Sequence, residues 1–113
     1  MNIEQCGAVD LNATCAGFVY GLQVAQGLVA SGMYHKIIVI GADTMSKITD
    51  YTDRSNCILF GDGAGAVMVE QSKEHRFLAA SSNANGSGAL HAYRTGLANT
   101  LQSEKLNDSG YFI

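Results

Sequence analysis

The chain has 113 residues, of which 47% are hydrophobic and 15% are charged, and its formal net charge is -3 at pH 7. This acidic balance argues against nucleic acid or an anionic membrane surface as the main partner, because both attract basic proteins. The low charge content leaves much apolar surface, so we expect further sequence or partner chains to cover part of it.

Three cysteines, Cys6, Cys15 and Cys57, make an odd number and show no Cys-x-x-Cys spacing. This pattern predicts neither a disulfide framework nor a zinc site, and we expect no bound metal. Free thiols suit a reducing compartment, so we expect a cytoplasmic protein. The chain does not open on a basic segment followed by an apolar run, and we therefore expect no signal peptide.

The first predicted elements are a short strand and a long helix. Ala8–Asn12 has the length and apolar content of a strand, and the residues after Cys15 keep a helical period for about four turns. Gly32 lies where a glycine often ends a helix. Residues 11–35 carry no charge, but polar side chains interrupt them and no basic cluster flanks them, so we expect no membrane span.

Cys15 is predicted to lie at the turn from this strand into the helix. Asn12 or Thr14 can cap the helix, because either side-chain oxygen can accept from free N–H groups of the first turn. The partial positive charge at a helix N-terminus favours the thiolate, which is the nucleophilic form of cysteine. Most free cysteines are small buried hydrophobes, however, and position alone leaves both interpretations open.

The predicted helix carries a row of small residues, Gly17, Gly21 and Ala25, with bulky apolar side chains around its other sides. A glycine inside a helix costs about 1 kcal/mol relative to alanine. The row therefore indicates that some other part of the protein approaches the backbone of the helix closely. A helix that is apolar nearly all round is also predicted to be buried.

The residues after the helix predict strands joined by loops. Lys36–Ala42 is a near-continuous aliphatic run, typical of a strand covered on both faces, and it predicts a right-handed βαβ unit with parallel strands. Residues 43–56 are polar and predict a surface loop with one helical turn. Three further runs are predicted as strands: Cys57–Phe60, Ala66–Glu70 and Phe77–Ser82.

A glycine-rich run, Gly61–Gly65, separates two of these predicted strands. Its Gly-x-Gly spacing could suggest a dinucleotide-binding loop, but such a loop opens a helix and this one leads into a strand. We predict a tight turn that lets backbone pass close to the helix after Cys15. Beyond it, residues 72–76 predict a charged linker and residues 83–96 a flexible segment.

Three motifs occur in order: Asn12-Ala13-Thr14-Cys15-Ala16-Gly17-Phe18, Thr52-Asp53-Arg54 and Phe60-Gly61-Asp62-Gly63-Ala64-Gly65-Ala66. Together they closely resemble β-ketoacyl-acyl-carrier-protein synthase III, the initiating condensing enzyme of type II fatty acid synthesis. The resemblance covers residues 8–70 strongly and the remainder weakly. It implies an α/β chain that is part of a thiolase-like fold, with a mixed sheet packed on a buried central helix.

The resemblance also implies a reaction and its participants. Cys15 would take an acyl group, typically acetyl, from acyl-coenzyme A, and its own N–H would be one oxyanion donor. Malonyl-acyl-carrier protein would then lose carbon dioxide, and the carbanion would attack the thioester to give a 3-oxoacyl-carrier product. No permanently bound cofactor is implied. Arg54 matches the residue against the coenzyme A adenine, and Phe60 and Met45 match positions near the acyl pocket.

Less specific interpretations of these residues stay open. From spacing alone, Arg54 is better explained as an exposed arginine paired with Asp50 or Asp53. Phe60 and Met45 could equally be plain core residues. A non-catalytic thiolase-like interaction module with a structural cysteine is the alternative to the acyltransferase. A cysteine hydrolase ranks last, because no histidine lies in a convincing context.

The chain departs from the family pattern in lacking the His-Gln-Ala-Asn and Gly-Asn-Thr-Ser contexts. Its histidines, His35, His75 and His91, are expected at the surface. We therefore expect a fragment, with residues 1–71 ending the N-terminal half and residues 72–113 forming a linker and the start of the C-terminal half. Alone it should not complete condensation, because no group is left to promote decarboxylation. The full-length protein is expected to be a homodimer.

Overall fold

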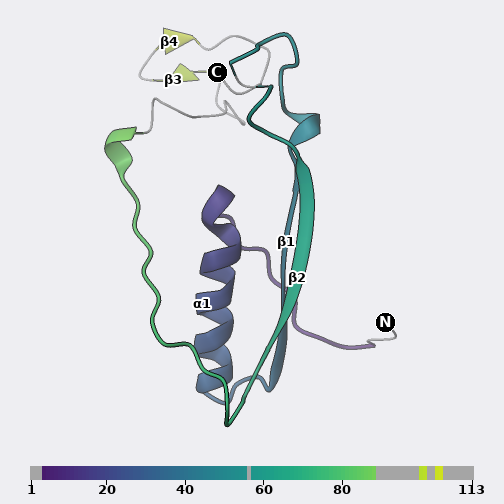
Figure 1. Ribbon diagram of the computed structural model, residues 1–113, viewed down its shortest axis with the longest axis vertical. Helices are drawn as coiled ribbons and strands as arrows, with labels where there is room; N and C mark the ends of the chain where they lie inside the picture. The colour runs from purple at the N-terminus through teal and green to yellow at the C-terminus, as the bar shows by residue number, and fades with distance from the viewer. Residues whose placement is uncertain (1–3, 56, 89–99, 102–103, 106–113) are drawn as a thin grey trace. The chain divides into compact units, whose positions relative to one another are not determined.

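The structure is a computed structural model that describes residues 4–55, 57–88, 100–101 and 104–105. Its main elements are α1 (Gly17–Ala30), β1 (Lys36–Thr44) and β2 (Asp62–Glu70), followed by β3 (Thr100–Leu101) and β4 (Glu104–Lys105) (Figure 1). Single turns of 3-10 helix occur at Thr14–Ala16, Met45–Lys47 and Gly86–Gly88. None of the helices in this described part is long and apolar enough to cross a membrane.

The chain divides into two compact units. The first consists of Met1–Gly41 and Gly65–Ser82, and the second of Ala42–Ala64 and Asn83–Ile113. The first unit contains α1 with parts of β1 and β2. The second contains the ends of these strands, the loop between them, and the antiparallel pair β3–β4, in which Thr100 faces Lys105.

The predicted helix is confirmed, including its C-terminal end. Helix α1 ends at Ala30, and Gly32 adopts a φ of 76°, a left-handed conformation that suits glycine. The Gly32 N–H donates to the carbonyl of Val29 at 3.1 Å, and that of Ser31 donates to the carbonyl of Gly27 at 3.0 Å. These bonds satisfy carbonyl groups that the last turn leaves without helical partners.

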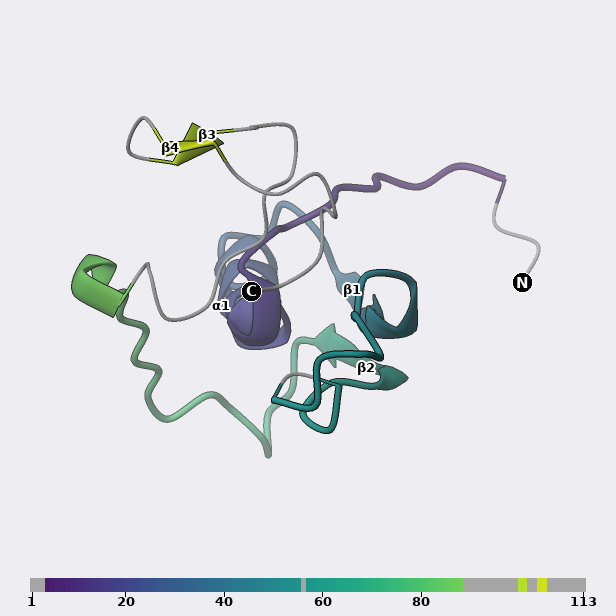
Figure 2. The same cartoon turned by 90° about the horizontal axis from the view of Figure 1, so that it is seen from above.

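Helix α1 packs closely on β1 within the first unit, and Figures 1 and 2 show the two elements side by side. The buried residues of the helix are Gly21, Ala25 and Val29, spaced four apart. A Cβ atom placed on Gly21 would lie 3.0 Å from Cγ1 of Val39, a buried β1 residue. The close approach predicted from the small-residue row is therefore confirmed at Gly21.

Strands β1 and β2 form a two-stranded sheet, and contacts at its two ends show that they run in opposite directions. At one end, Lys36 Nζ lies 3.2 Å from Glu70 Oε2. At the other, the N–H of Ser46 donates to Asp62 Oδ1 at 2.7 Å. The start of one strand thus lies beside the end of the other, as the connecting loop allows.

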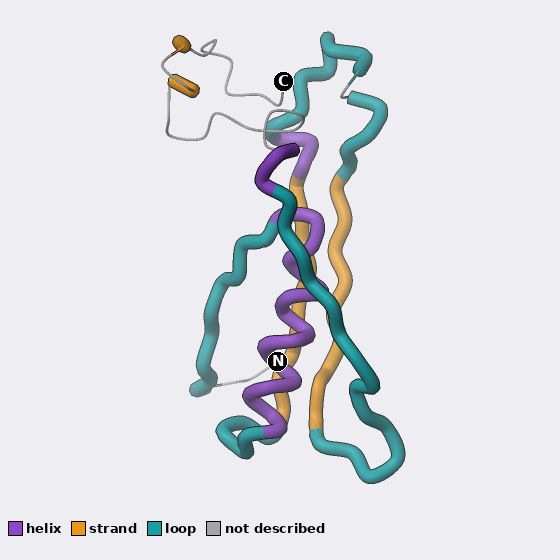
Figure 3. Tube along the Cα trace, turned by 90° about the vertical axis from the view of Figure 1, so that its left-hand side faces the viewer, coloured by secondary structure: helices purple, strands orange, loops and turns teal. Residues whose placement is uncertain are grey.

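The α/β class is confirmed, but the described residues do not complete the predicted βαβ unit. Ala8–Asn12 forms no strand, and Figure 3 draws it as loop up to the first helical turn. A strand exists only when its backbone groups pair with a neighbour. The described part of the chain places no partner strand beside this segment.

The prediction that both faces of the first long strand are covered is wrong for these residues. Alternate residues of β1 point toward and away from α1, so that Val39 is buried while Ile40 is 66% exposed. The helix is also covered on one side only, since Val19 and Val24 are 48% and 42% exposed. A single helix covers one face of a sheet, and no described segment lies on the other.

Two other predicted strands do not form, although Ala66–Glu70 is confirmed as part of β2. Cys57–Phe60 is a turn, because the Cys57 N–H donates to the carbonyl of Asp53 at 2.9 Å and coils the chain. Residues 77–82 form no backbone ladder with another strand. This segment contacts α1 through a side-chain hydrogen bond, in which Gln23 Nε2 donates to Ser82 Oγ at 2.6 Å.

The predicted tight turn at the glycine run is also wrong. Asp62, Gly63 and Gly65 belong to β2, and no described atom lies within 4 Å of a Cβ placed on Gly61, Gly63 or Gly65. The run therefore makes no close approach to the helix among the described residues. Pairing with β1 keeps these glycines extended.

Candidate functional site

Cys15 lies in a single turn of 3-10 helix, Thr14–Ala16, that leads directly into α1. Its side chain is exposed. The predicted position at the start of the helix is confirmed, and the burial expected of a structural cysteine is not observed in the described structure. An exposed thiol at this position can be reached by an external reactant.

The turn before Cys15 is sharp. Thr14 has a φ of 46°, and it is the only non-glycine residue with positive φ in the part of the chain that the structure describes. The left-handed conformation costs a residue with a Cβ atom roughly 1–2 kcal/mol. Such strain is often found at functional sites, where the surrounding structure maintains it.

Hydrogen bonds at this turn differ in part from those expected. Asn12 Oδ1 accepts from the Thr14 N–H at 3.4 Å, but no side chain caps α1 itself. The Ala16 N–H donates to the carbonyl of Ala13 at 3.1 Å. The Cys15 N–H has no such acceptor among the described residues and can serve as a donor to a bound group.

The other thiols and the histidines lie elsewhere. Cys6 is exposed and Cys57 half-buried, and both are free. His35 and His75 are exposed, as predicted, and His91 lies outside the described residues. Among the described residues, no three His, Cys, Asp or Glu side chains are grouped as metal ligands would be.

The other predicted site residues, Arg54, Met45 and Phe60, belong to the second unit, whereas Cys15 belongs to the first. Met45 and Phe60 are half-buried. Arg54 is exposed, and no described residue forms an ion pair with it. Pairing of Arg54 with Asp50 or Asp53 is therefore not observed.

The two aspartates instead bind hydroxyl groups two residues further along the chain. Asp50 Oδ1 accepts from the Thr52 N–H at 2.8 Å and from its Oγ1 at 2.7 Å. Asp53 Oδ1 accepts in the same way from Ser55, at 2.8 and 2.6 Å. The bonds from Thr52, the side-chain bond above all, hold the pKa of the Asp50 carboxyl below its ordinary value.

The second unit also contains a contact that the sequence did not reveal. Ser46 Oγ donates to Asp62 Oδ2 at 2.6 Å, while the Ser46 N–H donates to Oδ1 at 2.7 Å. These two bonds hold the pKa of the Asp62 carboxyl below its ordinary value, the side-chain bond contributing most. The residues are sixteen positions apart, and no local pattern links a serine after one strand to an aspartate that begins another.

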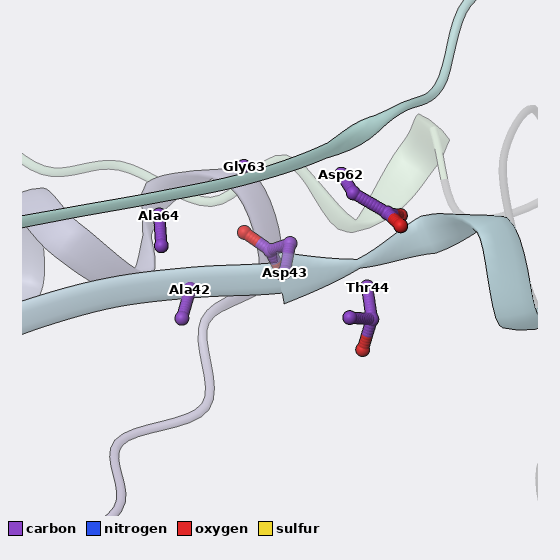
Figure 4. A pocket seen from close by; sticks show the side chains of 6 residues that line it. All are labelled: Ala42, Asp43, Thr44, Asp62, Gly63 and Ala64. Atoms are coloured by element: carbon purple, nitrogen blue, oxygen red, sulfur yellow. The ribbon is translucent and has the colours of Figure 1, made fainter.

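A pocket of about 300 Å³ lies beside this contact (Figure 4). It is lined by Ala42, Asp43, Thr44, Asp62, Gly63 and Ala64. Figure 4 shows the Asp62 side chain reaching from β2 toward β1. None of the predicted site residues lines the pocket, and its two carboxylates would repel an anionic ligand such as coenzyme A.

Known proteins resemble this chain along its whole length. The family described as 3-oxoacyl-[acyl-carrier-protein (ACP)] synthase III matches residues 9–86. β-Ketoacyl-[acyl-carrier-protein] synthase III 2 of Halalkalibacterium halodurans is 52% identical over 114 residues, which cover 100% of this chain and 34% of that protein. The protein of the same name from Bacillus subtilis is 50% identical, covering 97% and 34%. The chain thus spans about a third of the length of these relatives.

Solved structures agree with this match. β-Ketoacyl-[acyl-carrier-protein] synthase III of Thermus thermophilus is similar with a TM-score of 0.84 and 34% identity, covering 94% of this chain and 33% of that one. 3-Oxoacyl-[acyl-carrier-protein] synthase III of Aquifex aeolicus is 49% identical over 52% of this chain and 19% of its own, with a TM-score of 0.51. These similarities confirm the predicted thiolase-like fold. The chain belongs to the 3-oxoacyl-[acyl-carrier-protein] synthase III family.

Proposed function

We propose that the intact protein transfers an acyl group, typically acetyl, from acyl-coenzyme A to Cys15 and then condenses it with malonyl-acyl-carrier protein. The observation that carries this proposal is the position of Cys15, which is exposed at a sharp turn immediately before α1. Membership of the synthase III family supports the same reaction.

In the first step, the sulfur of Cys15 attacks the thioester carbon of acyl-coenzyme A. The bond from that carbon to the coenzyme A sulfur breaks, and the thiol proton leaves with coenzyme A. The Cys15 N–H, which has no described acceptor, is suited to bind the oxygen that becomes negative in the tetrahedral intermediate. The position of Cys15 in the turn immediately before α1 presents its sulfur as the nucleophile.

In the second step, malonyl-acyl-carrier protein loses carbon dioxide and its carbanion attacks the acyl carbon on Cys15. The thiolate leaves, and the product is a 3-oxoacyl-carrier thioester. The chain has no His-Gln-Ala-Asn or Gly-Asn-Thr-Ser sequence to promote decarboxylation. The 113 residues alone therefore acquire the acyl group at most, and condensation requires the rest of the intact protein.

Arg54 is proposed to lie against the coenzyme A adenine, with Phe60 and Met45 near the acyl chain. The exposure of Arg54 and the absence of a described ion partner support a role in binding an external ligand. The half-buried side chains of Phe60 and Met45 are compatible with either a pocket wall or core packing. No permanently bound cofactor is needed, because the substrate thioester supplies the activated acyl group.

The remaining expectations are proposals of the same kind. We place the protein in the cytoplasm as a homodimer, with residues 1–71 ending its N-terminal half and residues 72–113 beginning its C-terminal half. Exposed apolar side chains favour burial against further protein: Val19, Val24, Ile38, Ile40, Val67 and Met68 are all 38–66% exposed. The same surface supports the second candidate, a non-catalytic interaction module.

Labelling of the intact protein with radioactive acetyl-coenzyme A distinguishes these candidates. We expect label on the peptide that contains Cys15, and its loss in Cys15→Ala. Cys6→Ala is the matched control, because Cys6 is also exposed but does not precede a helix. Absence of label from Cys15 in the wild type, or normal condensation by Cys15→Ala, would contradict the acyltransferase.

A further inference from the structure

A serine and an aspartate close the loop that carries Arg54. Ser46 lies in the 3-10 turn directly after β1, and Asp62 is the first residue of β2. Ser46 donates twice, from its N–H to Oδ1 at 2.7 Å and from its Oγ to Oδ2 at 2.6 Å. Both carboxylate oxygens are thus used to hold together the two ends of the segment between them, residues 47–61. We name this contact the Ser46–Asp62 clasp.

Further hydrogen bonds brace the loop. Thr49 is buried, at 5% exposure, and its Oγ1 donates to the carbonyl of Met45 at 2.8 Å. The Asp50–Thr52 and Asp53–Ser55 bonds then form two successive local turns around Arg54. A surface loop whose ends are held together and whose described residues are braced by local hydrogen bonds is a frequent carrier of binding residues.

In this braced loop, the Arg54 guanidinium is the charged group that remains available to bind a ligand. The neighbouring carboxylates are each occupied by a hydroxyl and an N–H, and no described residue pairs with Arg54. A loop held in one conformation before binding loses less entropy when the ligand arrives. Breaking the contact between the two ends of the loop would therefore lower the affinity for the ligand. It would not change the reaction step at Cys15.

We propose that Ser46 and Asp62 are positioning residues for acyl-coenzyme A, acting through the loop that presents Arg54. The inference rests on the proposed acyltransferase function. Neither residue needs to touch the substrate. Both of Asp62's carboxylate oxygens already bind Ser46, so its contribution is to fix where the loop begins and ends.

The test compares clasp variants of the intact protein with a charge-matched control. Ser46→Ala removes one of the two bonds and Asp62→Ala removes both. Asp43→Ala removes a carboxylate that lines the same pocket but forms no described hydrogen bond to the loop. Ser46→Thr keeps the hydroxyl and is the conservative variant for rescue.

Steady-state kinetics with acetyl-coenzyme A separate positioning from general structural damage. We expect the KM for acetyl-coenzyme A to rise about tenfold in Asp62→Ala and less in Ser46→Ala, the size expected for lost hydrogen bonds to a charged group. We expect kcat to change less than twofold, and Ser46→Thr and Asp43→Ala to keep wild-type values. A fall in kcat at unchanged KM, or equal effects of Asp43→Ala, would overturn the proposal.

Limited trypsin digestion provides a readout that does not depend on activity. The loop contains two cleavage sites, after Lys47 and after Arg54. We expect faster cleavage there in both clasp variants and wild-type rates in Asp43→Ala. If wild-type protein takes no acetyl label, the proposed function fails. If it is labelled normally while cleavage and KM are unchanged in the clasp variants, this inference alone fails.

Discussion

The closeness of α1 to β1 predicts that alanine is unfavourable at Gly21. Alanine would gain about 1 kcal/mol over glycine in a helix interior. Its Cβ, however, would lie 3.0 Å from Val39 Cγ1, well inside the optimal carbon separation of about 3.5–4.0 Å. Val39 is only 8% exposed and is β-branched, so its side chain has little freedom to rotate away. Overpacking costs roughly 1–3 kcal/mol.

We therefore expect Gly21→Ala to lower the free energy of unfolding of the intact protein by about 1 kcal/mol, the typical overpacking cost less the gain in helix propensity. Urea denaturation followed by circular dichroism measures this change. Gly27→Ala is the matched control, because Gly27 lies in the same helix and no described atom is within 4 Å of its added Cβ. It should raise stability by roughly 1 kcal/mol.

A second background tests the mechanism. Val39→Ala removes the methyl group that obstructs the new Cβ. In the Val39→Ala background, Gly21→Ala should therefore raise the free energy of unfolding relative to Val39→Ala alone. Equal stabilisation by Gly21→Ala and Gly27→Ala in the wild-type background would refute the close packing of α1 on β1. A destabilisation that persists unchanged in the Val39→Ala background would show that another contact is responsible.

Two further predictions concern the turn before Cys15 and the titration of Asp62. Thr14→Asn should raise the free energy of unfolding by about 1 kcal/mol, because asparagine tolerates the left-handed φ of 46° at lower cost. Urea denaturation measures this change, and a lower free energy of unfolding would contradict the prediction. Ser46→Ala should raise the pKa of Asp62 toward its ordinary value, since the side-chain bond from Ser46 is the main cause of its lowering. A lowered carboxylate pKa contributes stability above the unfolded pKa, and this stability is lost as pH falls through the folded value. Nuclear magnetic resonance titration measures the shift, with Asp50 as the internal reference that should not move.

Elements whose structure depends on residues nearby in the sequence could be predicted. The helix after Cys15, its glycine at position 32 and the aliphatic run of β1 all follow from local periodicity and end chemistry. Strands were predicted less well. Residues 8–12, 57–60 and 77–82 are apolar enough for strands but form none, because a strand needs a paired neighbour that apolar content does not supply.

The candidate site shows the same division. The sequence alone determined that Cys15 lies just before a helix, because the helical period can be read from the residues that directly follow it. Only the tertiary structure decided that Asp62 binds Ser46, that β2 runs antiparallel to β1, and that Gly21 meets Val39. The physical reason is that these contacts join residues far apart in the chain, whose meeting depends on how whole elements pack.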